Sequence, residues 1–136
     1  MTVSQEERTL AGLVHLGVLF GWLGLAFQII MLVVYLPKSK FVANHVKQAL
    51  GVSVILYLIR FAFGTLVGGA GLWVAFNPVR LFTAGFIGPM LLAGLATAVL
   101  GLTVLVLVIM AMVKAFGGQP HRYPVIGDLI ASLTGE

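Results

Sequence analysis

Three long apolar stretches constrain the fold of this chain more than any other feature. Residues 10–36 contain no Asp, Glu, Lys or Arg, residues 49–76 contain a single one, Arg60, and residues 81–113 contain none. The hydrocarbon core of a bilayer is about 30 Å thick, and a helix that rises about 1.5 Å per residue crosses it in about 20 residues. Each stretch is long enough, so the sequence predicts three transmembrane helices.

The composition supports this class of protein. Of the 136 residues, 60% are hydrophobic and 9% are charged, whereas soluble proteins are about 45–50% apolar. A water-soluble domain of this length has too little interior to hide so much apolar surface. We therefore predict a single-domain, all-α integral membrane helical bundle. Its three spans are expected at residues 10–36, 42–63 (extendable to 76) and 81–113, and the tail at 117–136 is expected to contain a short amphipathic helix.

The lengths of the stretches leave the number of spans open. As straight helices, residues 10–36 and 81–113 would reach about 40 Å and about 50 Å, which is more than the hydrocarbon core requires. Glycine and proline at residues 21–24 and 85–89 would permit a break in either helix. A fourth span or a re-entrant segment is therefore the alternative, and a break in the first stretch would move the N-terminus to the inner side.

Basic residues beside the spans predict the orientation. Lys38, Lys40 and Lys47 follow the first stretch, and Lys114 and Arg122 follow the last one. Loops rich in Lys and Arg remain cytoplasmic, so we expect a multi-pass protein of the cell membrane with its first loop and C-terminus in the cytoplasm and its N-terminus outside. The net charge of +4 comes from residues scattered at span ends, which indicates the lipid bilayer as a partner and not nucleic acid.

Six polar side chains are expected at the membrane interface or in contact with lipid. The lysines of the first loop would bind lipid phosphates or anchor the helix ends. Arg60 would reach the outer interface if the second helix ended near residue 63. Gln48 would face a neighbouring helix or a headgroup, and Tyr123 would anchor the tail. The full set is Lys38, Lys40, Lys47, Gln48, Arg60 and Tyr123.

Two histidines raise the alternative of a haem site. Imidazole is an axial ligand of haem iron, and His15 and His45 lie in or beside the first two predicted spans. In the three-span arrangement they would be about 25 Å apart by helical rise, so they could share one iron only if the first helix were broken or a second subunit contributed. A metal site is not expected, because no carboxylate or cysteine accompanies them. The primary expectation is no cofactor, and haem b is the alternative.

No catalytic motif is present. The chain has no cysteine, and Ser53 and Asp128 lack the neighbours that nucleophilic or acid–base catalysis requires. Small residues at helical spacing, such as Gly17 with Gly21, favour close packing of helices in lipid. We therefore expect a protein that is not an enzyme. It would act as a homo-oligomer or as an accessory subunit of a larger membrane assembly, with a connection to transport as one such role.

Three short motifs resemble a known family. They are Leu-Val-His-Leu at residues 13–16, Phe-Val-Ala-Asn-His-Val-Lys-Gln-Ala-Leu at residues 41–50, and Gly-Gly-Gln-Pro-His-Arg-Tyr-Pro at residues 117–124. Together they resemble the prokaryotic membrane proteins called chloroplast-import-apparatus Tic-twenty-like. The resemblance implies a small polytopic protein of mostly uncharacterised biochemical function. It also implies a shared role for His15 and His45, and Tyr123 with Pro124 matches another of its recurring motifs.

Overall fold

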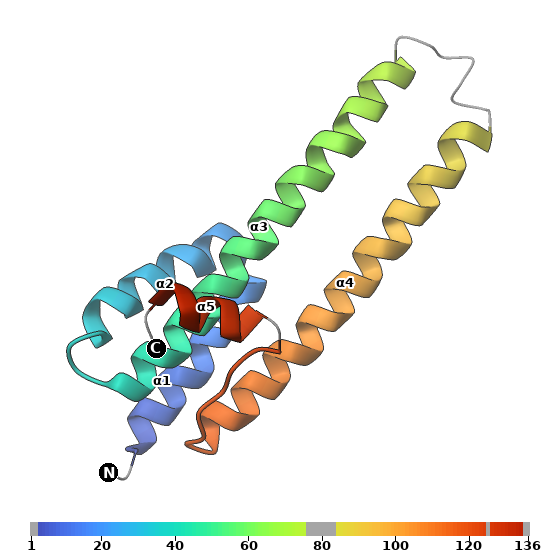
Figure 1. Cartoon of the computed structure of the whole chain (residues 1–136). Coiled ribbons are helices and arrows are strands. Elements are labelled where there is room, and N and C mark those ends of the chain that lie inside the picture. The colour runs from blue at the N-terminus through green and yellow to red at the C-terminus, as the bar shows by residue number, and fades with distance from the viewer. Residues whose placement is uncertain (1–2, 76–83, 125, 135–136) are drawn as a thin grey trace. The chain divides into compact units, whose positions relative to one another are not determined.

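The computed structural model describes residues 3–75, 84–124 and 126–134, and within these ranges it contains helices and no strand. This confirms the all-helical prediction. The chain divides into two compact units, Met1–Ile55 together with Leu105–Glu136, and Leu56–Val104, which are described separately. The elements, shown in Figure 1, are α1 (Gln5–Leu16), a 3-10 turn η1 (Gly17–Leu19), α2 (Gly21–Tyr35), α3 (Lys40–Ala75), α4 (Ala84–Phe116) and α5 (Ile126–Thr134).

Two of the predicted spans form long helices. By length and composition, Lys40–Gly69 of α3 and Ile87–Phe116 of α4 can each cross a membrane. The helices α3 and α4 cover the predicted spans 42–63 and 81–113, except for residues 81–83, which lie outside the described residues. The second helix does not end near residue 63 but continues to Ala75. It therefore takes the longer of the two predicted extents.

The first apolar stretch is not one helix, so the prediction of a single span at residues 10–36 is corrected. The chain turns through η1, and Gly21 adopts a φ of 62°, a backbone conformation that residues with a Cβ rarely adopt. The 12 residues of α1 and the 15 of α2 reach only about 18 Å and about 22 Å. Neither helix alone spans a hydrocarbon core of about 30 Å.

After the break, α1 and α2 pack against each other. A Cβ built on Gly24 would overlap the backbone of Gly17, so the two helices approach at glycine positions. The predicted pair was Gly17 with Gly21, but the turn at Gly21 brings Gly24 to Gly17 instead. The buried Gln28 donates from Nε2 to the carbonyl of Val14 (3.2 Å). This carbonyl lies at the end of α1 and also accepts from the N–H of Gly17, so the bond from Gln28 joins α2 to the end of α1.

The helical hairpin of α1 and α2 begins and ends at the same end of its unit. Ser4 and Glu7 form a capping box at the start of α1, and the Glu7 carboxylate also accepts a hydrogen bond from the side chain of Ser39, in the turn before α3. These hydrogen bonds to Ser39 and Ser4 lower the pKa of Glu7. The start of α1 therefore lies beside the lysine-containing turn, and not at the far end of a membrane-spanning helix.

The C-terminal end of α4 is fixed by the two glycines that follow it, Gly117 and Gly118. Gly118 has a φ of 70°, its N–H donates to Ala115 O (2.9 Å), and the N–H of Gln119 donates to Lys114 O (2.9 Å). These two bonds form the Schellman motif that ends many helices. The predicted short helix follows as α5, and it packs on α3, where Ile130 fills the space over Gly51.

The unit Leu56–Val104 presents its apolar side chains to the surroundings. Several of its large hydrophobic side chains are more than 60% exposed, and among them are Leu58, Phe61, Leu66, Leu91, Leu92, Leu95 and Leu102. A water-soluble protein rarely exposes so continuous an apolar surface, whereas lipid solvates it. Gly64, Gly68, Gly94 and Gly101 have no atom of another residue near an added Cβ. Close packing at these glycines would therefore require another chain.

Candidate functional site

A chain of buried polar side chains connects α1, α3 and the tail that follows α4. His15 on α1, His45 on α3 and Tyr123 in the tail are each at most 1% exposed. His15 Nε2 lies 3.0 Å from His45 Nδ1, and the Tyr123 hydroxyl lies 3.0 Å from His15 Nδ1. The broken first helix therefore brings the two histidines together, which was the condition that the sequence set for their meeting.

One backbone carbonyl determines the direction of the hydrogen bonds that join Tyr123, His15 and His45. Gln119 O lies 3.2 Å from His45 Nε2, and a carbonyl can only accept, so His45 donates from Nε2. A neutral imidazole has one donor and one acceptor. His45 Nδ1 therefore accepts from His15 Nε2–H, and His15 Nδ1 accepts from the Tyr123 hydroxyl. Burial raises the pKa of Tyr123, which keeps this hydroxyl protonated as the donor.

This hydrogen-bond chain is suited to holding segments together. With both imidazoles neutral, every ring nitrogen of His15 and His45 has one partner, as buried polar groups require. The chain ends at a peptide carbonyl, which does not pass a proton onward. Removing any member would leave a buried donor or acceptor without a partner, at a cost of about 1–3 kcal/mol. The arrangement therefore connects residues far apart in sequence without offering a proton pathway.

Gln48 adds a second connection between α3 and the tail. Its Oε1 accepts from the backbone N–H of Tyr123 (3.4 Å), and its Nε2 lies 3.5 Å from the carbonyl of Gly127. Both Gln48 and Tyr123 are buried. Their predicted roles as headgroup or interface contacts are therefore corrected. Gln48 instead follows the other expectation for it, a contact with a neighbouring segment, because two backbone groups of the tail need its amide.

His121 belongs to the same cluster, and sequence reasoning assigned it no role. Its ring centroid lies 4.8 Å from that of Tyr123 and 6.0 Å from that of His15. The side chain is only 7% exposed, yet neither ring nitrogen has a hydrogen-bond partner. Burial, followed by the charge of Lys114, lowers the pKa of His121. The spacing from Tyr123 was an available signal, because residues i and i+2 of an extended segment share a face.

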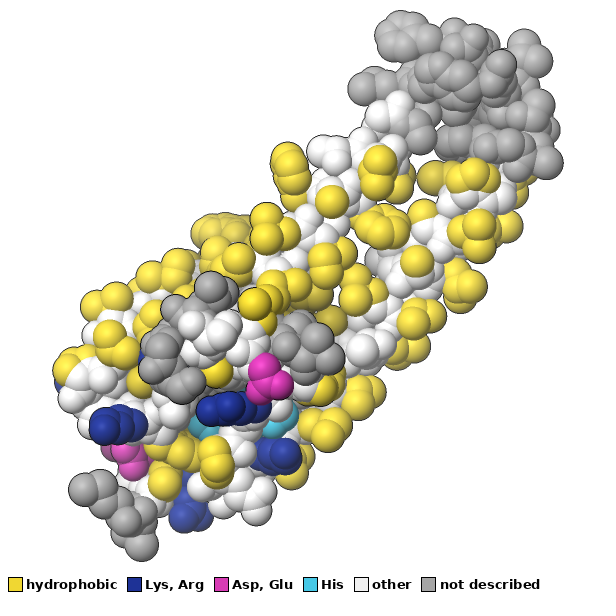
Figure 2. All heavy atoms as spheres, in the orientation of Figure 1, with side chains coloured by type: hydrophobic (Ala, Val, Ile, Leu, Met, Phe, Trp, Pro, Cys, Tyr) yellow, Lys and Arg dark blue, Asp and Glu magenta, His cyan; other side chains and the backbone are white. Residues whose placement is uncertain are grey.

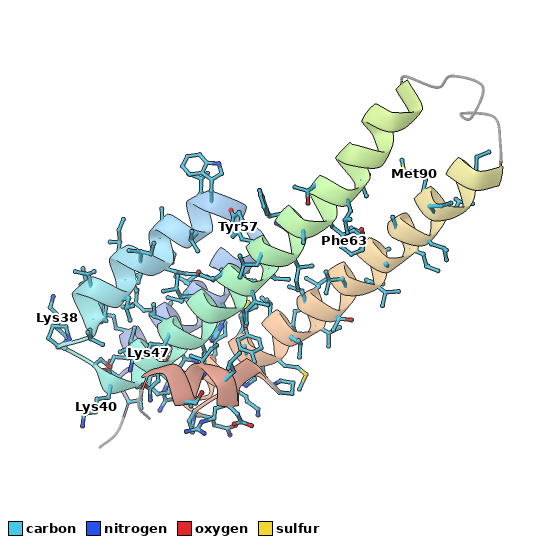
Figure 3. All side chains as sticks on the ribbon, turned by 45° about the horizontal axis from the view of Figure 1, so that its top comes forward. Lys38, Lys40, Lys47, Tyr57, Phe63 and Met90 are labelled. Atoms are coloured by element: carbon cyan, nitrogen blue, oxygen red, sulfur yellow. The ribbon has the colours of Figure 1, made fainter. Side chains whose placement is uncertain are left out.

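The basic residues remain at the surface. Lys38 and Lys40 are exposed and Lys47 is half-buried, and all three lie around the start of α3 (Figure 3). The space-filling view shows basic, acidic and histidine side chains gathered where the tail covers this end of α3 (Figure 2). Arg60 lies in the other unit, with an exposed side chain. The lysines occupy one polar end, which is where charged groups meet headgroups or water.

The facing nitrogens of His15 and His45 are too close together to bind one ion between them. Among the described residues, no group of three His, Cys, Asp or Glu side chains is arranged to hold a metal ion. Two imidazoles on one iron need nitrogens roughly 4 Å apart, because each metal–nitrogen bond is about 2 Å long. His15 and His45 instead contact each other at 3.0 Å. Their facing nitrogens share a proton and leave no room for an ion between them.

The fold and the exposed apolar surface define a helical membrane protein with a buried polar cluster at one end of its first unit. The chain matches the profile of the MamF/MmsF family, described as the magnetosome magnetite crystal formation protein family, over residues 6–130. It belongs to that family. No curated protein and no solved structure matches it.

The predicted resemblance to the Tic-twenty-like family is wrong, because the family that matches over nearly the whole chain is MamF/MmsF. The motifs behind that resemblance contain the residues of the buried chain: His15, His45 and Gln48, and Gln119 with Tyr123. They describe how α1, α3 and the tail pack. Packing motifs of this kind did not distinguish one family of small membrane proteins from another.

Proposed function

We propose that this protein takes part in magnetite crystal formation as a non-catalytic component of a magnetosome membrane. The observation that carries the proposal is the family match over residues 6–130. The described residues fit a role exerted through packing and placement. Several of their buried polar side chains bond one another or the backbone within the first unit, and the second unit offers an apolar surface to lipid or to other chains.

We propose two membrane spans and one re-entrant hairpin. In this arrangement α3 and α4 cross the bilayer, while α1 and α2 enter it from one side and return. The support is the shortness of α1 and α2 and the contact of Glu7 with Ser39. With Lys38, Lys40 and Lys47 on the cytoplasmic side, the N-terminus and the tail are cytoplasmic as well. This is the re-entrant alternative, with the N-terminus inside.

The proposed partners are lipid and other membrane proteins, including further copies of this chain. Lys38 and Lys40, exposed at the polar end, would contact lipid phosphates, and Arg60 would contact an interface. Helices associate in lipid through close backbone approach at small residues, and the open glycines of the second unit, such as Gly64 and Gly94, would permit it. We therefore expect a homo-oligomer or a place in a larger assembly.

Complementation tests the proposed function. A magnetite-forming bacterium that lacks its own members of this family would receive this chain, and crystal size would be measured by electron microscopy. We expect larger or more regular crystals than in the empty-vector strain, and a fluorescent fusion located at magnetosomes. Immunoblots of the membrane fraction establish that the protein is present. Crystals unchanged in a strain with membrane-inserted protein at the magnetosomes would contradict the proposal.

A further inference from the structure

A small polar cavity lies between one face of α3 and the tail. Its volume is about 140 Å³, and it is lined by Phe41, Asn44, His45, Gln48, His121 and Arg122. The four residues from α3 are spaced three and four apart, which places them on one side of the helix. All of these residues belong to the first unit. The cavity opens beside the buried hydrogen-bond chain but is not part of it.

His121 is the feature of this cavity that packing does not explain. It is more than nine-tenths buried, and both ring nitrogens lack a partner. A buried donor or acceptor without a partner costs about 1–3 kcal/mol. The other buried polar residues that line the cavity have hydrogen-bond partners: His45 Nε2 donates to Gln119 O, and Gln48 bonds the tail. Both ring nitrogens are buried, so an anion in the cavity would act on His121 through its charge and not through a direct hydrogen bond.

The charges around the cavity favour an anion over a cation. Arg122 supplies a guanidinium and Asn44 an amide, and no carboxylate lines the cavity. Arg122 has an ion pair with Asp128 at 3.9 Å, but both side chains are mostly exposed, so the pair is weak and exchangeable. His45 offers no lone pair on its outer nitrogen, because that nitrogen donates to a carbonyl. A metal ion would find a fixed positive charge and few ligands here.

We propose that this cavity binds a small oxyanion of phosphate chemistry. Arg122 would bind it through charge-assisted hydrogen bonds, which planar guanidinium groups form well with phosphate oxygens. Asn44 would add an amide contact, and the negative charge of the anion would act on the nearby ring of His121. The volume corresponds to roughly four or five water molecules at about 30 Å³ each, which suits one tetrahedral oxyanion. Inorganic phosphate and the phosphate of a lipid headgroup share this chemistry.

Binding should strengthen as the pH falls, because His121 would carry a proton when an anion lies beside it. Four groups face this ring from the elements packed against it: His15 on α1, His45 on α3, Lys114 on α4 and Tyr123 in the tail. None of these is an acid that is ionised near neutral pH, so the bound anion itself would supply the negative charge.

Sulfate titrations of the full chain in a phosphate-free maltoside detergent test the proposal. Sulfate keeps its charge between pH 5 and 8, so its affinity reports the protein group. By calorimetry, we expect Arg122→Gln to weaken binding about tenfold or more, as expected for loss of one charge-assisted contact. Lys38→Gln removes an equal charge from the same polar end but outside the cavity, and it should change binding less than about twofold. Both sites are exposed, so both variants should fold.

His121 provides an independent readout. The chain has three histidines, so their ring signals can be assigned by NMR. Sulfate should raise the pKa of His121 in the parent protein and not in Arg122→Gln. Absence of sulfate binding, equal effects of Arg122→Gln and Lys38→Gln, or an unchanged His121 titration would each overturn the proposal. A role in crystal formation would be unaffected, because complementation measures it separately.

A second set of titrations distinguishes the two sources of phosphate. Glycerol 1-phosphate carries the phosphate and glycerol of a lipid headgroup, and inorganic phosphate carries only the anion. Affinity at least tenfold higher for glycerol phosphate, lost in Arg122→Gln, would identify the lipid headgroup as the occupant. Equal affinities, also lost in that variant, would identify the free anion. Either result supports an oxyanion site, and failure of both ligands to bind overturns it.

Discussion

At the residue scale, the carbonyl of Gln119 governs the state of two histidines that lie in different helices. It fixes the proton on His45 Nε2, and this in turn fixes His15 as the donor to His45 and the acceptor from Tyr123. Because the tautomers follow from a backbone atom, His15 cannot change its donor pattern to compensate for a lost neighbour. A substitution that removes the donor or acceptor of any one of these side chains therefore leaves its neighbour without a partner.

Tyr123→Phe tests this directionality. The variant keeps the ring but removes the hydroxyl, so His15 Nδ1 becomes a buried acceptor without a donor. We expect the free energy of unfolding to fall by about 1–3 kcal/mol, measured by SDS titration in maltoside micelles. Tyr57→Phe removes the same group from the other unit and should change stability by less than about 0.5 kcal/mol. Equal losses in the free energy of unfolding of the two variants would contradict the buried hydrogen bond from Tyr123 to His15.

The burial of His121 predicts a loss of stability in acid. Its pKa is lowered from the usual 6.5 in the folded protein, so the unfolded chain takes up a proton first as the pH falls. The free energy of unfolding should therefore decline below about pH 6.5, and His121 should contribute no pH dependence well above it. Thermal unfolding of parent and His121→Phe, from pH 7.5 to 5.0 in chloride without phosphate or sulfate, measures this. The variant should show the shallower decline, and identical slopes would exclude His121 as a source.

The residues of the cluster were only partly predictable from the sequence. His15 and His45 stood out as polar groups against an apolar background, but their contact depends on a helix break that hydropathy does not reveal. Gln48 was expected against a neighbouring helix or a headgroup, and the first of these describes its contact with Gly127 of α5. Tyr123 was expected at the interface but is buried. An amphipathic side chain near a predicted span end is equally suited to lipid or to burial, and only the path of the tail decides between them.

At the scale of elements, the hairpin of α1 and α2 depends on a close approach of two glycines. Gly24→Ala would place a methyl group against the backbone of Gly17, so the helices must separate or shift. We expect a loss of about 1–3 kcal/mol, as for overpacked cores. Gly64→Ala makes the same change in an apolar helix with open space and should be neutral, or stabilising by up to about 1 kcal/mol. Chemical unfolding of both variants gives the comparison, and tolerance of Gly24→Ala would exclude the close approach.

The helices themselves were predictable to different degrees. Lengths of apolar sequence identified α3 and α4. The break was predicted at residues 21–24, and Gly21, with its positive φ, lies in that range. The 3-10 turn that precedes it, Gly17–Leu19, was not predicted. Gln28 was a further signal, since an amide in a long apolar stretch commonly serves a backbone group left without a partner.

At the scale of the whole molecule, the fold makes a prediction about membrane topology that separates it from a three-span protein. Two spans with a re-entrant hairpin place the N-terminus, the lysine turn and the tail on one side. Three spans place the N-terminus opposite the other two. Charge alone does not decide, because the first residues carry both signs, with Glu6 and Glu7 followed by Arg8. The contact between Glu7 and Ser39 favours the first arrangement.

Cysteine labelling resolves this cleanly, because the chain has no cysteine of its own. Gln5→Cys, Pro37→Cys and Pro120→Cys are exposed positions in the three segments, and Asn77→Cys lies between α3 and α4 in sequence. In the plasma membrane of an expression host, a membrane-impermeant maleimide should react with Asn77→Cys in intact cells and with the other three only after lysis. The cysteine-free parent sets the background. Reaction of Gln5→Cys in intact cells, with Pro37→Cys still protected, would restore a first helix that crosses the bilayer. It would also require the His15–His45 contact to arise between subunits, because the two side chains could then no longer meet within one chain.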